Sequence, residues 1–241
     1  NNEDFSSETF AKFRNYRNEI SKRIASENPN YSGLIDSTGF PEGYGSTSQD
    51  VLIPAFLAAY SGKDALGASL SSMPIIPLPN WRVNYDGLMQ IKMIKKRFQT
   101  FTLGHAYRST YSIGSFASSL DYIEDNGYSS LINSNTGNFF SKYEIGQVTI
   151  NEQFSPLIKI DVTWKNSLIT KLEVKKNRTL SLSLSNNQLT EINGSEYVIG
   201  TGYMIKNLEF NFRSAGRKKK ISSDLDLKLD LNIRNNKTVI R

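Results

Sequence analysis

The chain has 241 residues, which is enough for one large domain or two small ones. It has no cysteine, and this excludes a disulfide framework and any metal centre that is held by cysteine. The formal net charge of +6 is scattered except for a basic block at Arg217–Lys220, so it defines no particular partner.

The longest apolar run, Val51–Tyr60, contains Pro54 and is well short of the roughly 18 apolar residues of a transmembrane helix. A helical membrane protein is excluded on this ground, whereas a soluble protein and a membrane β-barrel both stay open. The chain begins Asn1-Asn2-Glu3-Asp4, without an initiator Met or a signal segment. We therefore expect a processed chain or a fragment of a longer one.

The first 80 residues are predicted to form a helical and loop segment. Residues 6–25 place apolar side chains at helical spacing, and a second short helix is expected over 48–60. Residues 28–50 are rich in Asn, Ser, Gly and Pro and are predicted to form a loop. Met73–Pro79 has three prolines and should be extended. Residues 1–80 would then be a rim element, a loop or a plug-like insertion.

From residue 81 onward the hydrophobic period changes to two. Strict alternation of apolar and polar side chains marks strands with one apolar face and one wet face. The alternating apolar residues are Phe101, Leu103, His105, Tyr107, Tyr111 and Ile113, then Ile158, Ile160, Val162 and Trp164, then Leu180, Leu182 and Leu184, and finally Leu225, Leu227, Leu229, Leu231 and Ile233.

Polar junctions between these runs predict antiparallel connections. Lys165–Ser167, Lys175–Arg178 and Asn235-Asn236 are predicted to be hairpin turns, since Asn tolerates the positive φ of tight turns. Longer polar connections are expected over 118–153, 186–196 and 214–222. A further strand would begin at Lys237 and stop at Arg241, so we expect a sheet that is incomplete at both ends.

Alternation alone fits both a membrane barrel and a soluble β-sandwich. Aromatic residues near strand ends, as in an interfacial girdle, favour the barrel. Small or hydroxylated residues on the opposite face, such as Gly104, Ala106, Thr110 and Ser112, suit a channel wall. The predicted fold is thus an all-β membrane protein, with residues 81–241 forming antiparallel strands of a very large transmembrane β-barrel. The alternative is a soluble envelope β-sheet protein that binds lipid or a surface ligand.

The barrel hypothesis assigns a set of side chains to the lipid-facing wall. These residues are Phe101, Leu103, Tyr107, Tyr111, Ile160, Val162, Trp164, Leu180, Leu182, Leu184, Leu225, Leu227, Leu229 and Leu231.

No motif in the sequence nominates a catalytic, cofactor-binding or metal-binding residue. His105 is the only histidine and lies on an apolar face without ligand partners at matching spacing. The aspartates at 224, 226 and 230 alternate with leucines, as a solvated face would. Gly43–Ser46 lacks the context of a phosphate loop. Arg217–Lys220 is predicted to be a hydrated turn, with lipid phosphate as its alternative ligand and no nucleic acid partner.

Several long stretches of the chain are similar to the C-terminal part of one family. They are IPAFLAAYSGKDA at 53–65, IPLPNWRVNYDGL at 76–88, the stretch 102–122 that begins TLGHAYRSTYS, and the stretch 154–210 that begins FSPLIKIDVTWKN. In these stretches the chain resembles the SprA/Sov family of outer-membrane translocon proteins of bacterial type 9 secretion.

The resemblance implies a very large single-chain barrel that exports folded proteins across the outer membrane of Bacteroidetes-type bacteria. It also implies a role in gliding motility where the organism glides. The implied partners are the remainder of the same barrel polypeptide, a PorV-type outer-membrane protein, a plug protein, secreted cargo and outer-membrane lipid. No cofactor and no enzymatic activity are implied.

Overall fold

The computed structural model describes the chain except residues 1–7, 72, 74–79 and 215–216, and it leaves aside the side chains of residues 211–219. The first residues of the chain and most of the proline-rich stretch Met73–Pro79 therefore lie outside the described residues. In chain order the elements are α1 (Glu8–Glu27), α2 (Gln49–Ser61), β1 (Trp81–Tyr85), η1 (Gly87–Gln90), α3 (Lys92–Arg97), β2 (Phe98–Ser118), β3 (Glu124–Asp125), β4 (Tyr128–Ser129), β5 (Tyr143–Trp164), β6 (Leu168–Ser183), β7 (Gln188–Ser214) and β8 (Arg217–Ile240).

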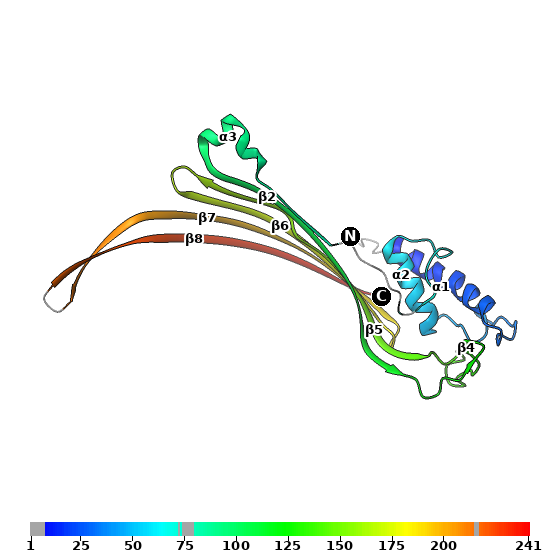
Figure 1. Ribbon diagram of the computed structural model, residues 1–241. Helices are drawn as coiled ribbons and strands as arrows, with labels where there is room; N and C mark the ends of the chain where they lie inside the picture. Colours follow the sequence, from blue (N-terminus) through cyan, green and yellow to red (C-terminus); the bar gives the residue numbers. More distant parts are fainter. Residues whose placement is uncertain (1–7, 72, 74–79, 215–216) are drawn as a thin grey trace, which may run out of the picture.

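Six strands form one antiparallel main sheet in the order β1-β2-β5-β6-β7-β8. The strands are long and the sheet is strongly bent, with α1 and α2 at one end and α3 at the other (Figure 1). The β7–β8 hairpin extends beyond its neighbours (Figure 1). The expectation of a mostly antiparallel β protein is confirmed. The sheet itself is open, because β1 and β8 are its two edges and do not pair with each other.

The two predicted helices are present and pack together on the sheet. Phe13 of α1 meets Phe56 of α2, whose side chain is fully buried, and Ile20 of α1 belongs to the same core. Gly62 ends α2 in the left-handed conformation that a helix C-cap favours. The helix pair buries its apolar side against the end of the sheet that includes Val148, Ile150, Leu180, Leu182 and Leu189. No helix in the described part of the chain is long and apolar enough to cross a membrane.

One predicted hairpin turn is confirmed and two are wrong. The chain turns between β5 and β6 at Lys165–Ser167, where Ser167 has a positive φ of 68°. By contrast, Lys175–Arg178 lies inside β6 and Asn235-Asn236 lies inside β8. Asn177 and Asn236 both pair with Gly194 of β7, which offers room for their amide groups. These polar residues are neighbours in one row across three strands, which sequence patterns do not reveal.

The predicted long connection between β2 and β5 is confirmed for residues 119–142, which hold only the short strands β3 and β4. The rest of this connection and most of the other two predicted connections are strand. Residues 143–153 belong to β5, residues 188–196 to β7, and residues 217–222 to β8. The predicted separate strand at Lys237–Arg241 is therefore wrong, since residues 237–240 continue β8. The short helices η1 and α3, between β1 and β2, were not predicted.

Candidate functional site

The two faces of the main sheet differ in chemistry across all its long strands. In one row, Leu103, Ile160, Leu172, Ile199 and Leu231 lie opposite one another on β2, β5, β6, β7 and β8. We call the side that carries this row the apolar face. In the next row along, Ile158, Val174, Tyr197 and Ile233 continue it. The side chains alternate in register, so every strand contributes to the same face.

The apolar face is open to the surroundings over much of its area. Leu229 keeps 72% of its surface exposed, Ile199 51% and Leu172 42%. A soluble monomer rarely exposes a contiguous apolar surface that crosses several strands. This face is therefore suited to contact lipid or another protein.

Aromatic rings lie at both ends of this exposed stretch. At the end near α3, the rings of Phe98 and Trp164 are 4.5 Å apart. Toward the helix pair, Tyr107 lies 4.5 Å from the ring of Trp81 and 4.7 Å from that of Phe154. Aromatic rings at two levels of a sheet, among them the amphipathic rings of Trp164, Trp81 and Tyr107, are typical of side chains at the two interfaces of a membrane.

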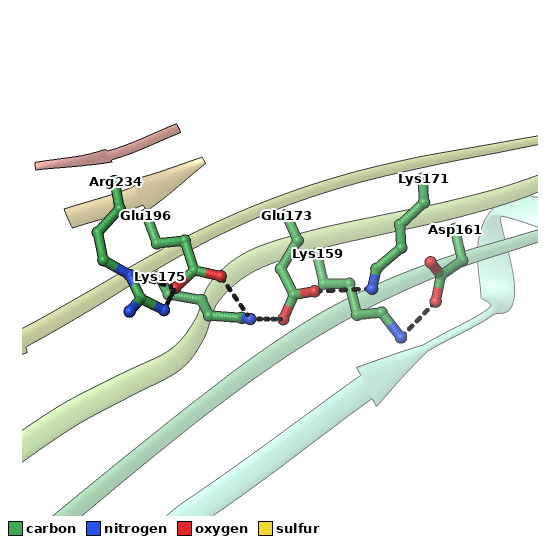
Figure 2. A network of polar contacts seen from close by, with 7 residues as sticks. All are labelled: Lys159, Asp161, Lys171, Glu173, Lys175, Glu196 and Arg234. Carbon is green, nitrogen blue, oxygen red and sulfur yellow. Dashed lines mark hydrogen bonds and ion pairs between the residues drawn. The ribbon is translucent and has the colours of Figure 1, made fainter. Parts of the chain in front are cut away.

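The opposite side of the sheet, which we call the polar face, carries a network of ion pairs (Figure 2). Glu173, only 8% exposed, accepts from Lys171 at 3.1 Å and lies 3.9 Å from Lys175. Lys175 also contacts Glu196 at 3.1 Å, and Glu196 pairs with Arg234 at 2.6 Å. These side chains come from three neighbouring strands, β6, β7 and β8.

A separate ion pair lies beside this network on β5, where Lys159 and Asp161 are 2.6 Å apart (Figure 2). Gly200 lies among these groups, and a Cβ at this position would collide with the carboxylate of Asp230. The polar face thus combines paired charges with small residues, and it suits contact with water.

The structure divides the predicted lipid-facing residues into two groups. Those on the exposed part of the apolar face are Phe101, Leu103, Tyr107, Ile160, Val162, Trp164, Leu225, Leu227, Leu229 and Leu231, of which Val162 is itself buried at 7% exposure.

The second group lies beneath the helix pair, and its assignment to lipid is corrected. Leu180 and Leu182 are 0% and 1% exposed, and Tyr111 and Leu184 pack against the same core. All four side chains do lie on the apolar face. However, α1 and α2 cover that face at this end, so these residues contact protein.

A row of polar residues crosses the apolar face between its exposed part and its helix-covered part. It consists of Ser109, Glu152, Arg178, Asn193 and Lys237, which are paired directly from β2 to β8. We call it the polar row. Sequence reasoning missed it, although Lys176 and Arg178 interrupt the leucine and valine alternation along β6.

Arg178 connects the polar row to the helix pair. Its guanidinium lies 3.2 Å from Glu191, 3.7 Å from Glu152 and 5.5 Å from the ring centre of Tyr60 in α2. Burial raises the pKa of Tyr60 to about 12, so this side chain is neutral at physiological pH. A cation above a neutral aromatic ring stabilises the contact between helix and sheet.

The remaining candidate residues contact neighbouring groups of the sheet. His105 Nδ1 lies 2.6 Å from the carbonyl oxygen of Leu157, and its ring is near Trp81. Asp224 accepts from the backbone N–H of Asn207 at 2.9 Å, and Asp226 lies 4.0 Å from Lys228. Among the described residues, no three His, Asp or Glu side chains gather as metal ligands would.

The two loop predictions have different outcomes. Within Gly43–Ser46, Tyr44 is part of the buried core, and burial raises its pKa to about 12. The predicted turn at Arg217–Lys220 is wrong, because these residues pair with β7 as the first part of β8. Lys220 contacts Glu209 across this hairpin at 2.6 Å.

The comparisons with known proteins identify no family. No protein-family model matches the chain, and no curated protein shows significant similarity to it.

Proposed function

We propose that this chain forms part of the wall of a protein-conducting channel in a bacterial outer membrane. The observation that carries the proposal is the two-faced sheet: an exposed apolar face on one side and a network of paired charges on the other. In a transmembrane barrel, an outer apolar band meets lipid and the inner wall meets water. The stretch Leu225–Ile233 has about the 9–11 residues that a tilted strand needs to cross a bilayer.

The transport role rests on the resemblance to SprA/Sov proteins of type 9 secretion. By that resemblance the cargo consists of folded secreted proteins, with gliding motility supported where it occurs. The partners would be the rest of the barrel polypeptide, a PorV-type outer-membrane protein, a plug protein and outer-membrane lipid. The mechanism is physical: apolar side chains hold the wall in lipid, while charged side chains keep the passage wet.

The open edges support a wall that continues past this sheet. Backbone groups at a sheet edge cannot be left unpaired in hydrocarbon, where each costs several kcal/mol. Among the described strands, none pairs with the outer side of β1 or of β8, so further strands would have to pair with them within the membrane.

Two neighbouring residues of β8 test the assignment of faces. Leu227 lies on the apolar face and Lys228 on the polar face. In the intact protein, Leu227→Arg should prevent stable membrane assembly, because an arginine at mid-bilayer costs about 2–4 kcal/mol. Lys228→Leu should leave assembly intact. Retention in the outer membrane after carbonate extraction measures both, and the reverse pattern would refute the assignment.

The alternative function is a soluble envelope protein whose apolar face binds lipid or a surface ligand. One observation favours it: α1 and α2 already cover one end of the apolar face. If further helices covered the rest of that face, the sheet would have the buried core of a soluble protein. Under this alternative, carbonate extraction releases the unmodified protein without detergent.

A further inference from the structure

The apolar face has three zones along β6. The first zone is exposed and contains Leu172 and Val174. The second is polar and contains Lys176 and Arg178. The third lies beneath the helix pair and contains Leu180 and Leu182. β6 pairs with β7 without any register shift, so these alternate side chains share one side of the sheet. The helix pair and the exposed apolar zone therefore lie on the same side.

This placement bears on where the helices lie relative to a channel. The ion-pair network of Glu173, Lys175 and Glu196 lies on the opposite side of the sheet from α1 and α2. A segment that fills the passage would cover this polar face. If the apolar face meets lipid, the helix pair is instead outside the passage.

Lys176 lies at the border between the exposed zone and the polar row. It is directly opposite Phe154, whose ring contacts Tyr107, and Tyr107 in turn contacts Trp81. Its side chain is exposed, and within the described ranges no carboxylate pairs with it. The nearby carboxylates are already engaged, because Glu152 contacts Arg178, and Glu191 contacts both Arg178 and Arg241.

A free ammonium next to a group of aromatic rings matches the chemistry of a lipid headgroup region. Aromatic side chains prefer the level of the headgroups, and lysines there attract lipid phosphates. The helix pair would then lie just past the membrane surface. The last turn of α2 holds Tyr60 against Arg178. In the loop after α2, 68% of the surface of Leu66 is exposed.

Resting on the proposed function, we propose that α1 and α2 lie on the lipid side of the wall, outside the channel, and that Lys176 binds a lipid phosphate in front of them. The helix pair is then a collar at the membrane surface. It shields from water the end of the apolar face that lies beneath α1 and α2. The bound headgroup lies between the helix pair and the bilayer.

A spin label tests the position of the helices. The intact protein with Leu66→Cys is labelled and reconstituted in vesicles that contain a nickel-chelating lipid. The label's relaxation should be enhanced by nickel held at the headgroups. If only a water-soluble nickel complex enhances it, the collar is refuted. This test is independent of the Leu227→Arg test. If the sheet is a membrane wall but the helices lie elsewhere, Leu227→Arg still prevents assembly, whereas the spin label is not relaxed by the nickel lipid.

Charge removal tests the lipid site. Binding of phosphatidylglycerol to the intact detergent-solubilised protein is followed by native mass spectrometry. Lys176→Gln should weaken the tightest binding about fivefold, the effect of one lysine near an anionic surface. Lys228→Gln removes the same charge from the polar face and should leave this binding unchanged. Equal effects of the two substitutions, or none from Lys176→Gln, would refute the site.

Discussion

Gly43 joins the loop before α2 to a distant loop that precedes β5. Its carbonyl oxygen accepts from the backbone N–H of Phe139 at 2.8 Å, and the ring of Phe139 lies 5.0 Å from that of Tyr44. Gly43 has φ +83°, and a Cβ there would collide with the Phe139 ring. Glycine is required here both for its backbone conformation and for the close approach.

Gly43→Ala should therefore destabilise the protein strongly. Gly39 is a matched control, because its φ is +86° and nothing lies within 4 Å of a Cβ at that position. Both substitutions pay the cost of a left-handed backbone, whereas only Gly43→Ala forces the aromatic ring to move. We expect Gly43→Ala to lower the free energy of unfolding by about 1–3 kcal/mol more than Gly39→Ala. Urea unfolding in detergent micelles measures both free energies. Equal decreases for the two variants would show that the Phe139 ring can move at little cost.

At the scale of elements, the helix pair is held by its apolar interface with the end of the sheet. Phe56 of α2 is 0% exposed and meets Phe13 of α1 edge to face at 6.5 Å between ring centres. Polar contacts fix the direction of α2. The Gln49 side chain donates to the carbonyl oxygen of Tyr143 at 2.7 Å and accepts from the N–H of Ile145 at 2.8 Å.

Removal of the Phe56 ring should loosen the packing of α1 against α2, because this ring meets Phe13 of α1. Phe56→Ala is expected to cost about 3–5 kcal/mol, the loss typical of a buried phenylalanine. Phe116→Ala removes a ring that is 53% exposed and should cost about 1 kcal/mol or less. Limited trypsin digestion of the assembled protein would reveal the difference, as faster cleavage within residues 8–71 for Phe56→Ala. Similar cleavage of both variants would mean that the ring does not hold the helices.

At the scale of the whole molecule, the main sheet has two unpaired edges. β8 pairs with β7 from Thr190 to Ser214, and none of the described strands pairs with its other side. A long edge strand is a template for pairing with another strand. The proposed channel wall supplies such a strand from the remainder of the barrel polypeptide.

Hydrogen exchange of the intact protein in membranes tests whether β8 is an interior strand. If a further strand pairs with it, all backbone amides of Leu225–Ile233 should exchange as slowly as those of Leu168–Val174 in β6. An unpaired edge would instead give fast and slow amides in alternation along β8. That pattern would contradict a wall that continues past this strand.

Sequence patterns alone predicted the alternating strands from residue 81 onward and the two helices before them, of which the first is amphipathic. Local periodicity decides both, because the side-chain period of a strand or helix is a property of its own backbone. It also predicted the chemical contrast between the leucines of 225–231 and the charged residues between them. The hairpin at Lys165–Ser167 could be predicted for the same reason, because a tight turn depends on local sequence.

Which side chains meet across strands could be read only from the packing of the folded chain. Asn177 and Asn236 look like turn residues in the sequence, and they became strand residues because both pair with Gly194. Leu180 and Leu182 have the same alternation as Leu227 and Leu229, yet the first pair lies under helices and the second pair is exposed. Coverage of a face depends on where a distant segment packs, and periodicity carries no information about that.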